Sequence, residues 1–186
     1  MWAGPARAQV ISETAPPRFP DPKKFARGFF ATGELGALVF VGSAAKAAGP
    51  GAAFGVRLGY DILRWLSLQA HLMGASGESK LPGPNEGQSF QTLVYGGEAH
   101  LQAQIRRFGL YGEAGAACAQ IATNVLDQAQ FTNGNHFSLA VVAGGGLDYH
   151  TLNRHFSFGA GADYLWLANF DKSHAISVQA YLKYTH

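Results

Sequence analysis

The sequence predicts an all-β protein whose eight antiparallel strands close into an up-and-down transmembrane β-barrel, and three observations lead to this prediction. Eight segments alternate apolar with small or polar residues at the two-residue period of a strand. Along the chain, the connections between these segments alternate between long and short. Charged residues make up only 14% of the 186 residues, yet the mean hydropathy is -0.01. This composition fits a barrel wall in which every second side chain meets lipid.

Composition argues against several other classes of protein. The sequence has no run that approaches the roughly 18 consecutive apolar residues of a membrane-spanning helix. The formal net charge of +2, without a basic stripe and interleaved aromatic residues, argues against a nucleic-acid partner. Cys118 is the single cysteine, so an intrachain disulfide is excluded, and its place among alanines is typical of a small strand residue. The length predicts one domain.

The first 28 residues are predicted to precede the barrel. Ala6, Arg7 and Ala8 have the small-x-small form of a signal peptidase site, so residues 1–8 are interpreted as the remnant of a signal peptide. The alternative is a disordered leader that carries this tripeptide by chance. Residues 9–28 contain four prolines and are predicted to form a Pro-rich periplasmic N-terminal segment. The barrel itself is assigned to residues 29–186.

The first three strands are predicted from a clear alternation. Residues 29–41 form the first strand, and residues 52–62 form the second, in which every even position is apolar. Leu63 and Arg64 leave room only for a tight turn before the alternation resumes over residues 66–74, so these two strands form an antiparallel hairpin. Among the inward side chains of these three strands, those predicted to form an interior polar network are Glu34, Arg57, Asp61 and His71.

Five further strands repeat the pattern. They are predicted at residues 91–105, 108–119, 136–150, 156–166 and 176–184. Arg106 and Arg107 make the second short turn, and Leu152, Asn153 and Arg154 make the third. Among the inward side chains of these strands, those predicted to belong to the same interior polar network are Glu98, His100, Glu113, Asp148, Asp163 and Lys183.

The longer connections are predicted to be polar loops, at residues 43–50, 76–89, 121–135 and 169–174. Short turns at one end and long loops at the other are typical of outer-membrane barrels, which have their short turns in the periplasm. The same asymmetry predicts that both termini are periplasmic. Aromatic residues near the strand ends, such as Trp65 and Trp166, predict two girdles at the membrane interfaces.

From about Phe29 onward, the chain resembles the small eight-stranded outer-membrane barrels of Gram-negative bacteria, the OmpA/OmpX-like class. The resemblance depends on the strand count, the asymmetry of the connections and the glycine-rich stretches at residues 109–115 and 144–161. It implies a location in the outer membrane of the cell envelope, in contact with lipid and lipopolysaccharide.

A soluble β-sandwich or a lipocalin-like barrel would also alternate. Its water-facing positions would need many Lys, Glu and Thr residues, whereas the second face here carries Gly, Ala, Ser and Gln with isolated charges. This contrast favours the membrane barrel.

The inward charges allow two interpretations, a narrow gated channel or proton path, or a plug of ion pairs and hydrogen bonds. Buried charges must be paired, and Arg57 is predicted to pair with Glu34 and His71, and His100 with Glu113. Bulky inward residues are expected to fill the lumen: Phe30, Leu38, Phe40, Met73, Tyr111 and Tyr181. The plug is therefore preferred.

Two His-x-Ser pairs are similar to an element of outer-membrane lipid A deacylases, and they are His136 with Ser138 and His155 with Ser157. Parity points the first pair into the lumen, and the second pair has its histidine at the periplasmic end, far from the outer leaflet. The seven histidines have no metal-ligand spacing. No catalytic residue, cofactor or metal site is therefore predicted.

Three functional classes follow from the sequence. The preferred class is a non-enzymatic structural or interaction barrel, acting through its loops or as the outer-membrane subunit of an envelope-spanning complex such as a motility or secretion machine. A narrow, porin-like channel is the first alternative, and a lipid A-modifying enzyme is the second. The expected partners are outer-membrane lipid, lipopolysaccharide and other envelope proteins, with no nucleic acid.

Overall fold

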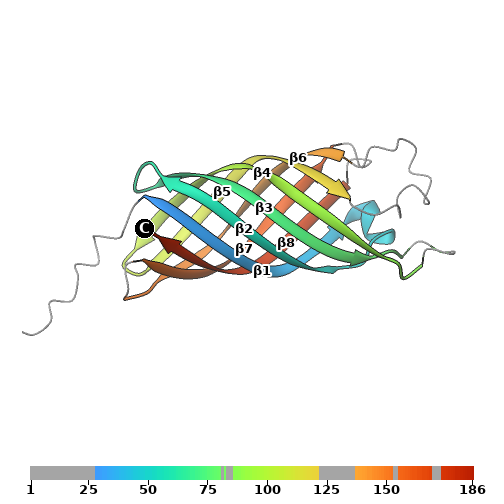
Figure 1. Ribbon diagram of the computed structural model, residues 1–186, viewed down its shortest axis with the longest axis horizontal. Helices are drawn as coiled ribbons and strands as arrows, with labels where there is room; N and C mark the ends of the chain where they lie inside the picture. Colours follow the sequence, from blue (N-terminus) through green and yellow to red (C-terminus); the bar gives the residue numbers. More distant parts are fainter. Residues whose placement is uncertain (1–27, 81, 83–85, 122–136, 153–154, 169–172) are drawn as a thin grey trace, which may run out of the picture.

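The protein is a closed barrel of eight antiparallel strands in sequence order, in which β1 pairs with both β2 and β8 (Figure 1). The computed structural model describes residues 28–80, 82, 86–121, 137–152, 155–168 and 173–186. The elements are β1 (Phe29–Val41), η1 (Gly42–Lys46), β2 (Gly51–Asp61), β3 (Leu66–Glu78), β4 (Ser89–Ile105), β5 (Phe108–Ile121), β6 (Phe137–His150), β7 (Phe156–Leu167) and β8 (Ser173–Thr185). The predicted eight-stranded up-and-down barrel is confirmed. None of its described helices is long and apolar enough to span a membrane.

Two predicted loops contain regular structure. Residues 43–50 were expected to be irregular, but the 3-10 helix η1 lies there, with Ala44 and Ala48 packed against the barrel core. β3 and β4 also continue into the loop predicted at residues 76–89, because Ser76 pairs with Gln91 and Gly77 with Phe90. The predictions for residues 1–27 lie outside the described residues.

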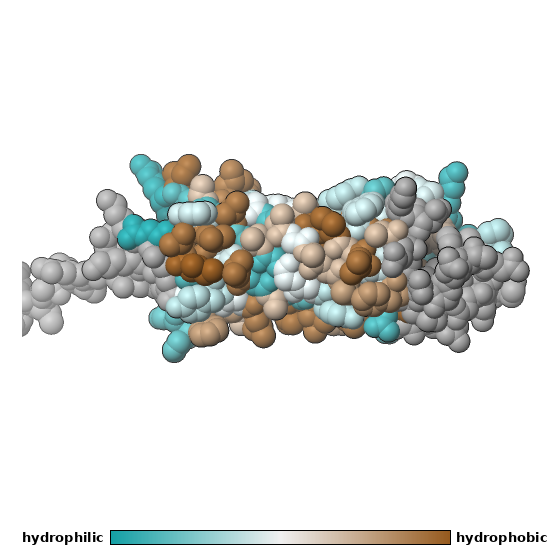
Figure 2. All heavy atoms as spheres, turned by 90° about the horizontal axis from the view of Figure 1, so that it is seen from above, coloured by the Kyte–Doolittle hydropathy of each residue, from teal (hydrophilic) through white to brown (hydrophobic). Residues whose placement is uncertain are grey.

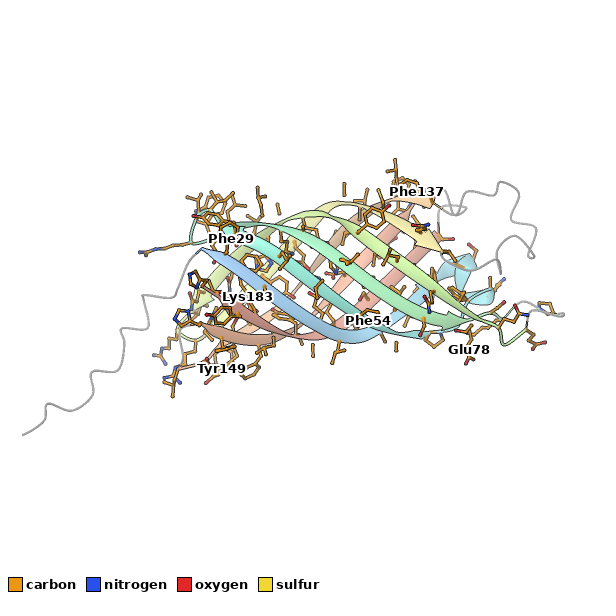
Figure 3. The ribbon with its side chains drawn as sticks, in the orientation of Figure 1. Phe29, Phe54, Glu78, Phe137, Tyr149 and Lys183 are labelled. Atoms are coloured by element: carbon orange, nitrogen blue, oxygen red, sulfur yellow. The ribbon has the colours of Figure 1, made fainter. Side chains whose placement is uncertain are left out.

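The two ends of the barrel differ, and we name them here. The turn end holds the short β2–β3 and β4–β5 turns and the end of β8, and the loop end holds η1 and the ends of β3, β5 and β7 (Figure 1). In Figure 3, Phe29, Tyr149 and Lys183 lie toward the turn end, and Phe137 and Glu78 lie toward the loop end.

The outward wall is apolar. Every strand alternates exposed and buried positions along most of its length, and large apolar side chains occupy the exposed ones, among them Leu35 and Ile105, which are 72% and 77% exposed. Figure 2 shows apolar and small residues along the wall, with hydrophilic residues mainly at the two ends. Around the turn end the outward aromatic rings contact one another, as in Phe29 with Tyr60 and Phe108 with Tyr149. Water would penalise such a surface, whereas lipid accepts it.

The interior is divided into two halves of opposite character. Its loop-end half is mainly apolar, with a few buried hydroxyl groups, and η1 packs against it. We call the buried apolar side chains of this half the apolar plug. They are Leu38, Phe40, Ala53, Met73, Ala75, Phe90, Val94, Ala117, Ala119, Ile121, Ala140, Val142, Leu165, Leu167 and Ala175. The middle and the turn-end half hold polar and charged side chains. The interior of the barrel therefore has a mainly apolar half at the loop end and a polar half at the turn end.

Candidate functional site

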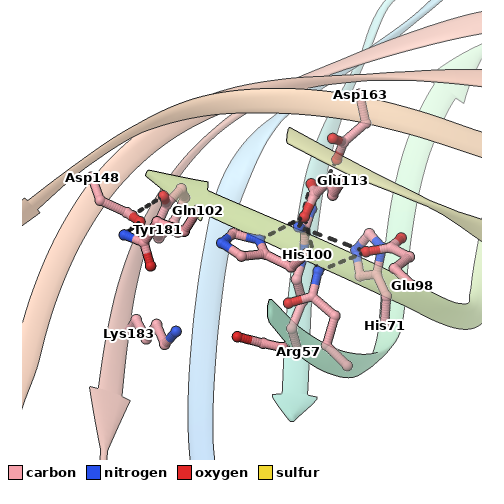
Figure 4. A network of polar contacts seen from close by, with 12 residues as sticks. Arg57, His71, Glu98, His100, Gln102, Glu113, Asp148, Asp163, Tyr181 and Lys183 are labelled. Carbon is pink, nitrogen blue, oxygen red and sulfur yellow. Dashed lines mark hydrogen bonds and ion pairs between the residues drawn. The ribbon is translucent and has the colours of Figure 1, made fainter. Parts of the chain in front are cut away.

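Arg57 of β2 is the centre of a buried charge network inside the barrel (Figure 4). The side chain points inward because it lies on the odd positions of β2, and the residue is only 4% exposed. Its Nε lies 2.5 Å from Oε1 of Glu34 on β1, and its Nη1 lies 2.5 Å from Oε1 of Glu113 on β5. Its Nη2 lies 2.8 Å from Oδ2 of Asp163 on β7. One guanidinium thus joins strands on different sides of the lumen.

His71 and Gln69 of β3 extend the network beside Arg57. The two ring nitrogens of His71 lie 3.3 Å from Oε2 of Glu34 and 2.9 Å from Oε1 of Glu98. The Gln69 amide donates to Glu98 at 2.8 Å and to Glu113 at 2.9 Å. These bonds link β1, β3, β4 and β5.

His100 of β4 and Gln179 of β8 bind the same carboxylates from the other sides. Nδ1 of His100 lies 3.3 Å from Oε2 of Glu113, its partner in strand register, and the imidazole stacks on Tyr111 at 4.6 Å between ring centroids. The Gln179 amide donates to Asp163 at 2.6 Å. The Arg57 network consists of Glu34, Arg57, Gln69, His71, Glu98, His100, Glu113, Asp163 and Gln179.

A second polar group lies nearer the turn end. Asp148 accepts hydrogen bonds from the Tyr181 hydroxyl and from the Gln102 amide. Nζ of Lys183 lies 3.7 Å from Oδ1 of Asp61 and 3.8 Å from the centre of the Phe30 ring. Both side chains of the Lys183–Asp61 pair are 14% exposed, so the polar half is closer to water at this end than it is around Arg57.

Glycines on inward positions make room for the long polar side chains. Gly55 lies opposite Glu34, Gly115 opposite Glu98, and Gly144 opposite both Glu113 and Asp163. A Cβ at Gly144 would overlap the Asp163 carboxylate and the carbonyl oxygen of Ala162. The narrow interior can therefore hold this many carboxylates only because the strands beside them carry glycine.

Replacing Gly144 with alanine is expected to destabilise the barrel by about 1 to 3 kcal/mol, because the added methyl group displaces the Asp163 carboxylate from Arg57. Chemical unfolding in detergent micelles, followed by tryptophan fluorescence, measures this change. Gly33→Ala is the matched control, since nothing lies within 4 Å of a Cβ at Gly33. Equal stability of the two variants would contradict the packing argument.

The Arg57 network joins strands from different sides of the lumen. Its carboxylates are held by hydrogen-bond donors, and it is deeply buried. Ser138 is fully buried at the loop end and donates to the Leu139 carbonyl oxygen. Ser157 is buried at the turn end, and a ring nitrogen of His155 lies 2.7 Å from the Thr185 carbonyl oxygen. His136 lies outside the described residues.

No group of three or more His, Cys, Asp or Glu side chains is arranged to hold a metal ion in the described part of the chain.

The structure divides the sequence-predicted polar residues into the two groups above. It brings Glu34, Arg57, His71, Glu98, His100, Glu113 and Asp163 together around one guanidinium, and it places Asp61, Asp148 and Lys183 nearer the turn end. Sequence reasoning did not identify Glu113 and Asp163 as partners of Arg57. It left out Gln69 and Gln179, whose signal was their inward parity beside the charged residues, and it placed Tyr181 inward only as a bulky side chain that fills the lumen.

Comparison with known proteins gives a family model and several similar structures. The model of the outer membrane protein beta-barrel domain matches residues 22–183. Neisserial surface protein A has 13% sequence identity and a TM-score of 0.62, with 88% of this chain and 100% of that chain covered. Ail, the attachment invasion locus protein of Yersinia pestis, has 14% identity and a TM-score of 0.54, with 85% and 98% covered. The N-terminal barrel domain of Pseudomonas aeruginosa OprF has 14% identity and a TM-score of 0.52, with 86% and 98% covered. No curated protein matches the chain. At these identities the structures show a shared fold.

Proposed function

Because the chain belongs to the outer membrane protein beta-barrel domain family, and is thus an outer-membrane barrel, we propose that it has a structural or interaction role, is closed to ions and performs no covalent chemistry. The observation that carries this proposal is the filled interior, with the apolar plug at one end and the Arg57 network in the middle. An eight-stranded barrel has an interior just wide enough for such side chains.

The two halves of the interior oppose ion passage in different ways. In the Arg57 network, a passing ion would have to separate opposite charges that lie 2.5 to 3.7 Å apart. In the apolar plug, Leu38, Met73, Val94 and Val142 are each no more than 3% exposed, and an ion there would lose its hydration among mainly apolar side chains, with only a few buried hydroxyl groups nearby.

The narrow channel is the second candidate, and one observation favours it. Lys183 and Asp61 are partly exposed at the turn end, so water can approach the polar half of the interior from that side. A polar path would still end at the apolar plug. We therefore prefer the closed barrel to the channel as the proposed function.

The enzyme alternative finds little support in the candidate nucleophiles. Ser138 and Ser157 are buried inside the barrel, whereas a lipid substrate would arrive at the outward wall. A hydrolytic serine also needs an adjacent base that is oriented by a third group.

The interaction role is assigned to the loop end and the outward wall. Ail was crystallised with a heparin analogue, sucrose octasulfate. We propose that this chain likewise acts through surface contacts, either by its loops or as the outer-membrane subunit of an envelope complex such as a motility or secretion machine. Its expected surroundings are lipid, lipopolysaccharide and other envelope proteins.

The test of this function compares cells with and without the gene. Cross-linking followed by purification in mild detergent is expected to recover a defined envelope protein with the barrel, and the lipid A mass spectrum is expected to be unchanged by deletion. A lipid A species that disappears on deletion, and also with Ser138→Ala in a folded barrel, would contradict the proposal in favour of the enzyme.

We also propose that the turn end and both termini face the periplasm, as the loop asymmetry of outer-membrane barrels implies. In a Cys118→Ser background, a membrane-impermeant maleimide is expected to label Glu86→Cys on intact cells and to leave Arg107→Cys unlabelled until the cells are lysed. Both positions are exposed, at the loop end and the turn end respectively. Labelling of Arg107→Cys on intact cells would reverse the orientation.

A further inference from the structure

The turn end has a basic surface that neither the interior nor the proposed loop contacts use. Arg64 lies in the β2–β3 turn, and Arg106 and Arg107 form the β4–β5 turn. All three residues are exposed. The described side-chain carboxylates near this end, Asp61 and Asp148, point inward, where they bind partners in the lumen.

The two basic turns are neighbours. Leu63 and Leu66 exchange backbone hydrogen bonds, which makes Arg64 and Trp65 the tip of the first turn. The Trp65 carbonyl oxygen accepts from the backbone N–H of Gln102, and β4 then runs directly on to Arg106. Adjacent hairpins thus bring the three guanidinium groups to one side of the barrel rim.

Apolar side chains surround these arginines on the wall side. Trp65, Ile105 and Phe108 are all more than half exposed, and the girdle pair of Phe108 and Tyr149 continues around the rim. Tryptophan at such a position lies at the headgroup level of a bilayer, and an arginine beside it reaches the phosphates. The combination fits a lipid molecule, whose acyl chains and anionic headgroup meet at this depth.

The backbone of the second turn supports a role for its charge. Arg106 has a φ of 59°, and among the described non-glycine residues it alone has a positive φ. Glycine is favoured at the first position of a two-residue turn that needs this conformation. Arginine therefore occupies a position where glycine would be less strained, and the turn holds its charge at the rim of the barrel.

We propose that Arg64, Arg106 and Arg107, with Trp65, form a binding surface for the headgroup of an anionic glycerophospholipid at the turn end of the barrel. The short turns hold the arginines at the level of the aromatic girdle, so the lipid leaflet at this end supplies the ligand, and phosphatidylglycerol is the probe. The proposal rests on the membrane barrel and on the periplasmic turn end proposed above, but it does not need the closed lumen. Each basic residue near an anionic bilayer surface contributes about a fivefold gain in local affinity.

The experiment uses quenching of Trp65 fluorescence by brominated lipid. The full chain with Trp2→Phe and Trp166→Phe, which keeps Trp65, is folded into phosphatidylcholine vesicles that contain a minor fraction of brominated phosphatidylglycerol or of brominated phosphatidylcholine. We expect brominated phosphatidylglycerol to be enriched at least about fivefold around Trp65. A chain that keeps Trp166 instead is the matched reporter for the loop end, and it should show no enrichment.

Variants that lack these positive charges then test whether the arginines cause the enrichment. The test variant carries Arg64→Gln, Arg106→Gly and Arg107→Asn, residues that suit the turn geometry, and it is expected to lose the enrichment. The control variant carries Lys46→Gln and Lys80→Gln at the loop end, and it is expected to keep the enrichment. A change in gel mobility on boiling verifies that each variant is folded. Equal quenching by the two lipids, as expected if the surface instead binds an acidic protein, would overturn the proposal. Enrichment that survives charge removal, or displacement of the probe by equimolar lipid A, would overturn it as well. Failure here would leave the closed barrel intact, which is tested separately by conductance.

Discussion

Replacing Arg57 with methionine is expected to lower the free energy of unfolding by about 3 to 5 kcal/mol. The side chain is the one guanidinium among the four carboxylates of the Arg57 network, and it contacts Glu34, Glu113 and Asp163 directly. Without it, these carboxylates keep their desolvation cost and lose their main counter-charge. Unfolding in detergent micelles or vesicles measures the loss.

The matched control is Lys46→Met, which removes one exposed positive charge at the loop end and should change stability by less than about 0.5 kcal/mol. Adding Glu113→Gln to Arg57→Met should recover part of the loss, because one uncompensated charge is removed together with its partner. A loss below about 1 kcal/mol for Arg57→Met alone would show that the network does not stabilise the barrel.

Replacing both Phe40 and Phe90 with alanine is expected to destabilise the barrel as much as Arg57→Met does. It is also expected to open the lumen. The two rings lie 6.1 Å apart within the apolar plug, and replacing a buried phenylalanine by alanine costs about 3 to 5 kcal/mol. Because the rings are in contact, the two losses should not add in full. The vacated volume would let water enter the loop-end half and meet the polar half.

Conductance measurements distinguish the contributions of the apolar plug and of the Arg57 network to blocking ions. The Phe40→Ala, Phe90→Ala variant should show intermittent currents in planar bilayers, whereas Arg57→Met should remain silent because its apolar plug is intact. Phe54→Ala is the control, since Phe54 is of the same residue type but 67% exposed on the outward wall. Currents from Arg57→Met without currents from the plug variant would place the barrier in the charge network instead.

The strands could be predicted from the sequence because a wall with lipid on one side and a packed lumen on the other imposes a two-residue period on each strand. The same reasoning failed where that period carried no contrast. Residues 75–78 are small or polar on both faces, so the extension of β3 was predicted to be loop. The helix η1 is short and lacks a side-chain cap, so nothing in its sequence marked it.

The contacts of the Arg57 network could be predicted only in part. Glu34 lies on the strand paired with that of Arg57, and His71 lies opposite Arg57 in register, so sequence order was enough to bring them near it. Glu113 and Asp163 reach Arg57 across the lumen, and that distance depends on how the closed barrel staggers its strands. The division of the interior was missed for a similar reason, since the plug collects one to three residues from the loop-end part of every strand.

The measurement that tests the closed barrel most directly is single-channel recording of the unmodified protein in planar bilayers, with folding verified by its gel shift on boiling. The filled interior predicts no steady current at any moderate voltage, with the Phe40→Ala, Phe90→Ala variant in the same bilayers as the positive control. Steady unitary currents from the unmodified barrel would contradict the account and establish the channel.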